Sequence, residues 1–319
     1  MAELHPFYFC FTLDTEPDNL WIDGPVPAFT HFERLFDFHR ELTMSGARPT
    51  YLTTSEVAEH PDAARVMQRI MASGEAELGA HFHSWTRSWP FPVPDLGDPP
   101  AHACVHQLGQ DIEERMLEHT CSSLARYLGV RPVSYRGGRW SLNEESPRSL
   151  RNCGIIVDST VTPGLSWADA SNSLTCGPDF RHSPRHPYWL AEDLLELPVG
   201  ASFHPNRNTA VDQGPKARLM RLLRRTVGRP SGVLWLRPTT MSRSQMRACL
   251  EQLRQDQVPV WVAMIHSSEI GLNSYFQTED QVARFRSRCI ELVEDALSLG
   301  AVAATLTDAR ASVLQGEVG

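Results

Sequence analysis

The sequence predicts an α/β protein with mainly parallel strands, folded as a distorted (β/α) barrel. Short apolar runs rich in β-branched and aromatic residues alternate about eight times with longer stretches of helical periodicity. Such alternation produces right-handed strand–helix–strand units and a parallel sheet. Polar residues also stand at or just past the ends of the apolar runs, where barrels build their active sites. These residues are Asp14, His81, Arg136, Asp158 and His266.

The first half of the chain alternates regularly between the two kinds of segment. Glycine ends two of the expected helices, and proline begins the second of them. The stretch "SLNE" at 141–144 has the form of a capping box that opens a helix closing at Cys153-Gly154. The proline-rich segment 85–100 predicts a loop with rigid turns. We expect strands at 7–14, 49–54, 76–82, 132–136 and 155–159, and helices at 32–46, 61–74 and about 104–128.

The second half is less regular. Residues 164–193 are rich in Ser, Pro, His and Asp, and together with the basic stretch after them they predict an irregular excursion at about 164–232. No internal repeat and no linker divides the chain, so residues 1–319 are expected to form one domain. The remaining strands are expected at 194–199, 232–236, 258–265 and 301–306, and helices at 244–255 and 278–300.

The composition is typical of a soluble globular protein, with 41% hydrophobic and 21% charged residues. No run of about 18 apolar residues is present, and the N-terminal stretch lacks the basic region of a signal peptide. The seven cysteines are irregularly spaced without a CxxC pair, which favours buried thiols in a reducing compartment, so the cytoplasm is expected. A net charge of −8 argues against a protein that grips a nucleic-acid backbone.

One segment departs from this acidic balance. Residues 216–229, "KARLMRLLRRTVGR", carry six basic side chains and no acidic one, with apolar residues between them. A solvated helix with a buried apolar stripe is the simpler interpretation. The alternative is a patch that faces phosphate groups or a membrane surface.

Two short motifs place side chains that suit a metal-dependent hydrolysis. In "TLDTE", Asp14 and Glu16 are two residues apart, so both project to one side of an extended backbone. His81 and His83 in "ELGAHFHSW" have the same spacing. Two imidazoles and a carboxylate on one divalent ion, with positions left for water, form a hydrolytic zinc-type set. Either pair alone is a weak signal.

Two further residues could complete such a site. Arg136 in "SYRGGRW" could hold a catalytic carboxylate ionised and oriented. His266 ends the very apolar run "VWVAMIH", and taken in isolation it is more simply a structural histidine with satisfied hydrogen bonds.

Together and in this order, the motifs resemble those of the NodB-homology polysaccharide deacetylase family. The matching stretches are "LDTE", "ELGAHFHSW", "YRGGRW", "VDSTV" and "AMIHSSE", and the resemblance runs from about Tyr8 to Ala304. It implies a distorted (β/α) barrel and metal-dependent removal of acetyl groups from N-acetylated sugars. It also implies a divalent ion, for which Zn²⁺ is expected, and a carbohydrate substrate rather than a nucleic acid.

The resemblance implies roles for the residues that match the motifs. Asp14 would be the general base, Arg136 its partner and His266 the general acid. Glu16 and His81 would bind the metal, and Asp158 would orient His266 or Arg136. The residues expected to contact substrate are Trp85, Trp89, Phe91, Arg139 and Trp140, although packing at the rim explains each of the aromatic residues equally well.

The histidine motif differs from the usual family pattern of H-x-x-x-H. Trp85 occupies the fourth place after His81, and an indole has no lone pair to offer a cation. We therefore expect His83 to supply the second imidazole ligand. The alternative is that His83 hydrogen-bonds a ligand carboxylate from outside the metal site.

Three functions remain open from the sequence. The first is a metal-dependent deacetylase that acts on an N-acylated amino sugar of a polysaccharide or its precursor. The second keeps the hydrolysis but changes the acyl group or scaffold, as in a deformylase or another C–N hydrolase acting on a small metabolite or lipid-linked sugar. The third is a carbohydrate-binding barrel without catalysis.

Overall fold

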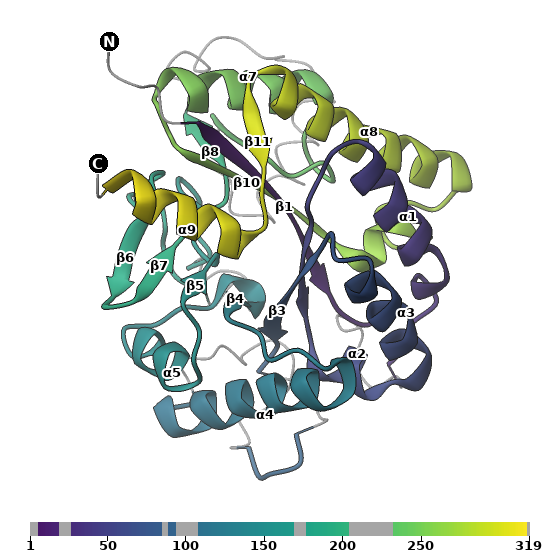
Figure 1. Ribbon diagram of the computed structural model, residues 1–319, viewed down its shortest axis with the longest axis vertical. Helices are drawn as coiled ribbons and strands as arrows, with labels where there is room; N and C mark the ends of the chain where they lie inside the picture. The colour runs from purple at the N-terminus through teal and green to yellow at the C-terminus, as the bar shows by residue number, and fades with distance from the viewer. Residues whose placement is uncertain are drawn as a thin grey trace, which may run out of the picture.

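The computed structural model describes residues 6–18, 27–84, 89–93, 108–168, 177–203 and 232–317. Its centre is a mostly parallel sheet curled into a distorted (β/α) barrel (Figure 1). Every pair of neighbouring strands in this sheet is parallel except the last, β7–β6. In spatial order the strands are β10 (Val260–His266), β1 (Phe7–Thr15), β2 (Thr50–Thr53), β3 (Glu77–Phe82), β4 (Ser134–Gly137), β5 (Val157–Asp158), β7 (Leu194–Glu196) and β6 (Tyr188–Ala191), and β11 (Ala301–Ala303) also pairs with β1.

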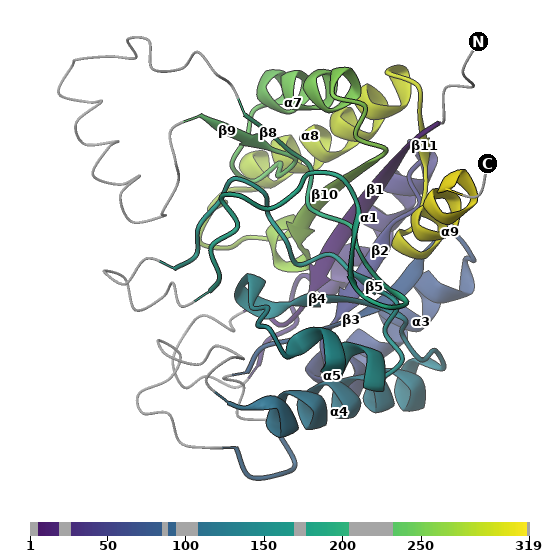
Figure 2. The same cartoon turned by 90° about the vertical axis from the view of Figure 1, so that its left-hand side faces the viewer.

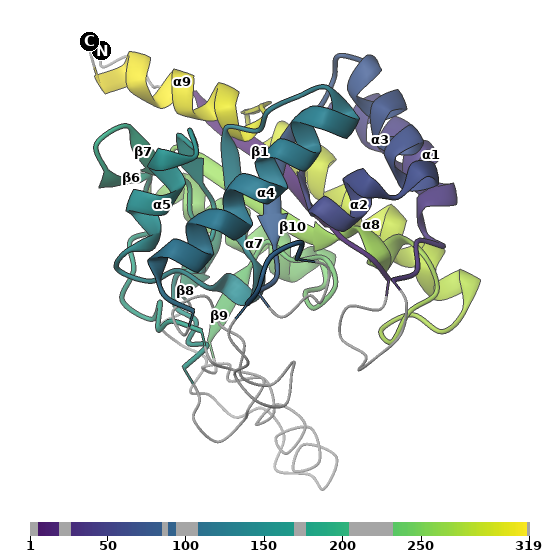
Figure 3. The ribbon, with the colours of Figure 1, turned by 90° about the horizontal axis from the view of Figure 1, so that it is seen from below.

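Helices cover the outside of the sheet in a nearly continuous ring. Neighbours in the ring pack together in the order α7–α8–α1–α3–α4–α5 (Figures 1 and 3). Their amphipathic faces point to the strands, as on α1, where the buried residues recur every three or four positions. The helices are α1 (Phe32–Met44), α2 (Ser55–Glu59), α3 (Pro61–Ala72), α4 (Gln110–Leu128), α5 (Ser146–Asn152), α7 (Arg243–Gln255), α8 (Glu279–Ser298) and α9 (Leu306–Glu317), with short 3₁₀ turns η2 (Gly138–Trp140) and η3 (Ser267–Ile270).

The gap between the two edges of the sheet is partly bridged. A two-stranded hairpin of β8 (Ala201–Phe203) and β9 (Val233–Trp235) lies beside β10 (Figure 2). Val199 forms a parallel bridge to Val262, and the Leu236 carbonyl accepts a hydrogen bond from the Met264 amide. Irregular backbone therefore spans part of the gap, and no regular strand pair closes the barrel among the described residues.

The two faces of β1 show how the sequence positions the site. Phe11 and Leu13 belong to the large apolar core between sheet and helices. Cys10 lies in a smaller inner cluster, and Thr12 and Asp14 share its face because strand side chains alternate. The Asp14 side chain therefore lies on the inner face of the barrel, near the carboxyl end of β1.

The structure adds elements that the sequence did not predict and moves others. Helices α2 and α9 and strands β6 and β8 were not predicted, and α4 is assigned from Gln110. The capping box expected at 141–144 is wrong, because the Asn143 side chain accepts the amides of Glu145 and Ser146 instead. Capping boxes do open α7 at Ser242 and α8 at Thr278.

None of the helices in the described part of the chain combines the length and apolarity needed to cross a membrane. The basic segment 216–229 and Trp85 lie outside the described residues.

Candidate active site and metal centre

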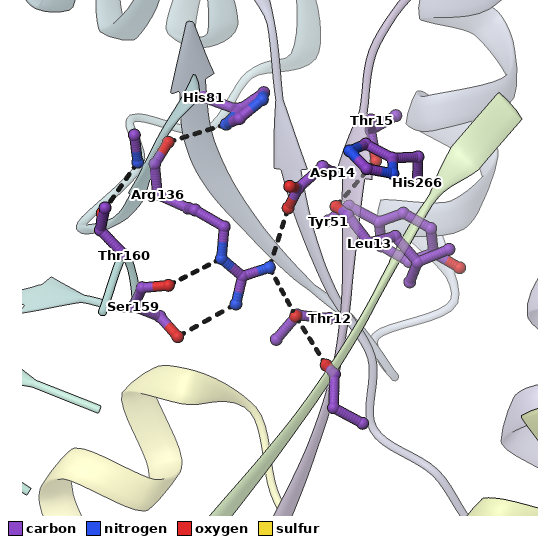
Figure 4. Close-up of polar contacts among 12 residues, drawn as sticks. Thr12, Leu13, Asp14, Thr15, Tyr51, His81, Arg136, Ser159, Thr160 and His266 are labelled. Carbon is purple, nitrogen blue, oxygen red and sulfur yellow. Dashed lines mark hydrogen bonds and ion pairs between the residues drawn. The ribbon is translucent and has the colours of Figure 1, made fainter. Parts of the chain in front are cut away.

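The strand register brings the predicted site residues to one end of the sheet. In the parallel pair β1–β10, Asp14 is the partner of His266, and in β3–β4, His81 is the partner of Arg136. All four residues lie at or near the carboxyl ends of their strands, so side chains that are far apart in sequence converge there (Figure 4).

A buried ion pair lies at the centre of this group. Arg136 is fully buried, and its Nη1 lies 2.8 Å from Asp14 Oδ1. Burial raises the pKa of Asp14, but the positive charges of Arg136, His81 and His266 together outweigh burial and lower that pKa below its usual value. Asp14 is therefore held as a carboxylate.

The guanidinium of Arg136 is fixed from several sides. Its Nε donates to the Ser159 carbonyl at 2.7 Å and its Nη2 to the Ser159 hydroxyl at 3.0 Å. Its Nη1 also donates to Thr12 Oγ1 at 2.8 Å (Figure 4). Because strands β1 and β4 and the segment after β5 all hold the same side chain, the direction in which Arg136 faces Asp14 is set by the fold.

Glu16, His81 and His83 form the one cluster of possible metal ligands found among the described residues. His83 Nε2 lies 2.6 Å from Glu16 Oε2, His81 Nε2 lies 3.5 Å from the same oxygen, and the two Nε2 atoms are 3.1 Å apart. All three side chains are buried. One carboxylate oxygen and two imidazole nitrogens thus point at a common position.

The donor set fits a divalent ion. In a tetrahedral site with ligand bonds of about 2.0–2.2 Å, neighbouring ligand atoms are about 3.3–3.6 Å apart. The 3.5 and 3.1 Å separations that involve His81 are near this range, whereas His83 and Glu16 are in direct hydrogen-bond contact at 2.6 Å and would have to move apart to bind an ion. The Arg136 carbonyl lies 2.7 Å from His81 Nδ1 and accepts its proton, which leaves the Nε2 lone pair directed to the cluster. Glu16, His81 and His83 are therefore the residues that could hold a metal.

The charges of the cluster depend on one another. Burial raises the pKa of Glu16, but the nearby imidazoles of His83 and His266 outweigh burial and hold that pKa well below its usual value. Burial lowers the pKa of His83. A carboxylate beside a neutral imidazole is the protonation state in which both groups can bind a cation.

The two glycines after Arg136 allow a tight turn, and the second of them makes room for the His83 ring. A Cβ atom on Gly138 would lie 2.4 Å from the Phe82 carbonyl oxygen and 2.6 Å from His83 Nδ1. A Cβ on Gly137 would lie 2.2 Å from the Ser141 carbonyl oxygen. The turn after β4 therefore approaches the His83 ring more closely than any residue with a side chain would permit.

The Nδ1 atom of His266 contacts both a guanidinium and a carboxylate. Its Nδ1 is 3.1 Å from Arg237 Nη2 and 3.4 Å from Glu269 Oε1, and Arg237 and Glu269 also pair with each other at 3.2 Å. Burial lowers the pKa of His266, but the carboxylates of Glu16 and Glu269 outweigh it and raise that pKa. The imidazolium form, which can donate a proton, is thereby stabilised.

Asp158 is buried, and its hydrogen bonds go to residues other than its two expected partners. Its Oδ1 accepts the Thr160 hydroxyl at 2.6 Å, and Thr160 Oγ1 accepts the Gly137 amide at 2.9 Å. Asp158 also shares a hydrogen bond with Glu196, its partner across the β5–β7 pair. The neighbouring Ser159, not Asp158, makes the hydrogen bonds to Arg136.

The expected aromatic residues lie in two groups. Trp140 is only 7% exposed and packs against Trp167 and Trp235. Trp89 and Phe91 are partly buried and contact each other. The ring of Trp140 is thus largely covered by protein, whereas Trp89 and Phe91 keep some exposed surface.

Arg139 sits in a strained turn beside Trp140. Both residues have left-handed backbone conformations, with φ of 55° and 59°. Burial lowers the pKa of Arg139 to about 10.

Sequence reasoning missed several residues that hold the site together. Glu269 stands three residues after His266 within the quoted motif "AMIHSSE", so its spacing was visible, but a lone H-x-x-E carries little weight. Arg237 and Ser159 gave no comparable signal, because only the folded chain brings them to His266 and Arg136.

Comparison with known proteins bears on the fold. The chain matches no protein-family model and no curated protein. It is similar to the structure of a candidate polysaccharide deacetylase from Mycobacterium smegmatis, with 17% identity over 96% of this chain and 91% of that one and a TM-score of 0.54. It is also similar to a 4-alpha-glucanotransferase from Thermococcus litoralis, with 13% identity, a TM-score of 0.54, and coverage of 96% of this chain and 40% of that one. At these identities the likeness establishes the distorted (β/α) barrel fold.

Proposed function

We propose that the protein is a metal-dependent amide hydrolase of the NodB-homology polysaccharide deacetylase type. In this proposal it removes an acyl group, most simply acetyl, from an N-acylated amino sugar of a polysaccharide or its precursor. The observation that carries the proposal is the convergence of Glu16, His81 and His83 beside the Asp14–Arg136 ion pair. The fold likeness to a candidate polysaccharide deacetylase supports it.

In the proposed mechanism, Glu16 and Asp14 have different roles. Glu16 would bind the ion together with His81 and His83, and a bound divalent ion would polarise the amide carbonyl and acidify water. Asp14 is held ionised by Arg136 and would accept the proton of the attacking water. The Arg136 guanidinium pairs with Asp14 at 2.8 Å and would keep the base charged and in place.

His266 would give a proton to the leaving amine. It stands opposite Asp14 in the β1–β10 register, so base and acid would act from neighbouring strands. Glu269 favours the imidazolium form that this step needs. The group that accepts the proton and the group that donates one would then lie on adjacent strands.

Zn²⁺ is the ion that we propose for this site, because one carboxylate and two imidazoles form a zinc-type ligand set with positions left for water and substrate. The choice between Zn²⁺ and another divalent ion rests on the donor types alone.

Two other functions deserve a direct comparison. A deformylase would use the same residues and differ in the acyl pocket. A carbohydrate-binding barrel without catalysis would need neither the ionised Asp14 nor the imidazolium of His266, and the buried network that maintains both charges argues against it.

The experiment combines metal analysis with product release. Purified protein should contain about one zinc per chain. It should release acetate from some member of a panel of N-acetylated monosaccharides, nucleotide sugars and oligosaccharides, with formate measured in parallel. Chelation should abolish release and zinc should restore it. Full activity in metal-free protein would contradict the mechanism, and a protein with neither bound metal nor product release would support the binding-barrel alternative.

Some expectations from the sequence stay predictions. These include the single domain over 1–319, the cytoplasmic location, and contact of segment 216–229 with anionic surfaces. Reversing Arg221, Arg224 and Arg225 to Glu should weaken binding to anionic vesicles in a salt-dependent way if that segment contacts membranes.

A further inference from the structure

A chain of three polar side chains leads from the surface of the barrel rim to the backbone of Glu16. Asp18 Oδ1 is hydrogen-bonded to His31 Nδ1, and His31 Nε2 lies 2.9 Å from the hydroxyl of Ser267. That hydroxyl lies 3.2 Å from the Glu16 amide nitrogen, which donates to it, and 3.4 Å from the Glu16 carbonyl oxygen. His31 and Ser267 are 2% and 0% exposed.

The order of donors and acceptors follows from the end of the chain. Asp18 also accepts the amide and hydroxyl of Thr30 on Oδ2, at 2.7 and 2.6 Å, which fixes the orientation of its carboxylate. With Oδ1 accepting the Nδ1 proton of His31, Nε2 is left as an acceptor for the hydroxyl proton of Ser267. The oxygen of Ser267 then keeps its lone pairs for the Glu16 amide.

The position of this chain in the fold suggests its role. Strand β1 ends at Thr15, so Glu16 lies just beyond the regular strand ladder. Ser267 begins η3 directly after His266, and His31 directly precedes α1. The three side chains therefore connect the end of β1, the start of α1 and the end of β10.

We propose that Asp18, His31 and Ser267 form a relay that positions Glu16 as a metal ligand by fixing its main chain. The inference rests on the proposed function, because it takes Glu16 as the carboxylate ligand. A ligand side chain reaches a fixed point only if its own backbone is fixed, and one hydrogen bond to the Glu16 amide provides that restraint. The same relay connects the backbone of the metal ligand to the segment that carries His266.

The residue types of the relay are those of a Ser-His-Asp catalytic triad, but the surroundings of Ser267 argue against a nucleophile. The hydroxyl is buried, and both the amide and the carbonyl of Glu16 are within hydrogen-bond distance of it. A serine nucleophile has to reach a substrate carbonyl. Ser267 is thus a positioning residue.

The test compares Ser267→Ala and His31→Gln with the wild type and with a matched control. His39 is another buried histidine between two hydroxyl groups, 3.1 Å from Tyr51 Oη and 3.1 Å from Ser73 Oγ, and it contacts none of the proposed ligands. His39→Gln therefore reports the general cost of losing a buried histidine with this pattern of partners. Thermal midpoints confirm that each variant is folded.

Two readouts are measured on the full chain. The first is the dissociation constant for Zn²⁺ alone, by competition with a chromophoric chelator. The second is hydrogen exchange of the Glu16 amide in metal-free protein, followed by mass spectrometry of fragments that isolate it. We expect the two relay variants to bind Zn²⁺ about 10–100-fold more weakly and to exchange the Glu16 amide faster, with neither change in His39→Gln.

The outcomes separate the relay from the proposed function. Unchanged Zn²⁺ affinity and unchanged exchange in Ser267→Ala would overturn the relay and leave the metal site intact. A wild type that binds no Zn²⁺ would overturn the proposed function, while the exchange of the metal-free protein would still show whether Ser267 holds the Glu16 backbone. Labelling of Ser267 by a fluorophosphonate would overturn the positioning role in favour of a nucleophile.

Discussion

The carboxylates of Asp14 and Glu16 are two residues apart yet have different surroundings. Asp14 is paired with Arg136, whereas Glu16 faces the imidazoles of His81 and His83. The ion pair keeps Asp14 ionised, whereas the Glu16 carboxylate lies among side chains that can themselves bind a cation. These different neighbours are the reason for proposing separate roles for the two carboxylates.

Substitution should separate the two roles. Asp14→Asn keeps a hydrogen-bond acceptor for Arg136 but cannot take a proton, so metal content should stay near normal while turnover is lost. Glu16→Ala removes a ligand atom and should lose the metal. Both are checked by metal analysis and by acetate release, with the thermal midpoint as a control for folding. Full metal occupancy in Glu16→Ala would contradict the assignment.

The pH dependence of activity should report His266. Its protonated form is the active one, so kcat/KM should fall as pH rises through the pKa of His266, which Glu16 and Glu269 raise above its usual value of 6.5. Glu269→Gln removes one of these carboxylates and leaves Arg237 nearby, so the basic limb of the profile should move to lower pH.

A matched variant tests the cause of that shift. Thr239→Val removes the hydroxyl that donates to Glu269 Oε2 at 2.7 Å but keeps the carboxylate charge. Its basic limb should therefore move much less than that of Glu269→Gln. Equal shifts in both variants would show that packing around Glu269, not its charge, controls His266.

For individual residues, the sequence indicated the candidate site residues more readily than the residues that hold them in place. Asp14, Glu16, His81, His83, Arg136 and His266 were identified from short motifs, and the fold brings them together. Ser159, Arg237, Ser267 and His31 were not, because a serine or arginine has no distinctive spacing and its role depends on partners from distant segments.

Among the secondary-structure elements, the turn from β4 into η2 lies directly against the cluster of possible metal ligands. Its Gly138 backbone lies against the His83 ring, with no space for a Cβ. The H-x-H spacing brings His83 to the cluster from the end of β3. The second glycine after Arg136, at the end of the neighbouring strand β4, leaves the space that the His83 ring occupies.

Gly138→Ala should therefore displace His83. We expect Zn²⁺ affinity to fall by about 10-fold or more and the free energy of unfolding to fall by about 1–3 kcal/mol from overpacking. Gly154→Ala is the control, since a Cβ there meets nothing within 4 Å and only the φ of +84° causes strain. It should cost about 1 kcal/mol and leave Zn²⁺ binding unchanged, as measured by titration and thermal unfolding.

Element prediction was most successful where the apolar pattern was long. The strands β1 and β10 and the helices α1, α3, α7 and α8 match their expected ranges closely. The strands β6 and β8 were missed because they are three or four residues long and partly exposed, so they lack a clear alternation. Helix α9 was missed because its apolar residues show little helical periodicity around its axis.

At the scale of the whole molecule, the buried pair of Asp158 and Glu196 affects how stability depends on pH. Burial raises the pKa of Glu196 well above its usual value, and the neighbouring Asp158 carboxylate raises it further. The pair is stable when it holds a proton between its two carboxyl groups. The unfolded chain releases that proton at ordinary carboxyl pKa values.

The contribution of this pair to stability should therefore fall as pH rises. Between the unfolded pKa of about 4.5 and the raised pKa of the folded protein, the folded state binds more protons than the unfolded state, so higher pH favours unfolding. Glu196→Gln replaces the shared proton with a permanent amide donor and should reduce this slope. Thermal midpoints from pH 5 to pH 9 provide the measurement, and an unchanged slope in the variant would place the cause elsewhere.

The parallel pairing of β1 with β10 also affects the order in which the site can assemble during synthesis. Glu16 and Ser267 are separated by 251 residues, so synthesis takes about 10–50 s to proceed from one to the other at ordinary translation rates. Glu16, His81 and His83 can meet early, while one edge of β1 has no neighbour until β10 leaves the ribosome. A nascent chain stalled before Val260 would expose that edge to pairing with other chains. We therefore expect the half-synthesised protein to bind zinc before it can catalyse anything, and to depend on chaperones during that interval.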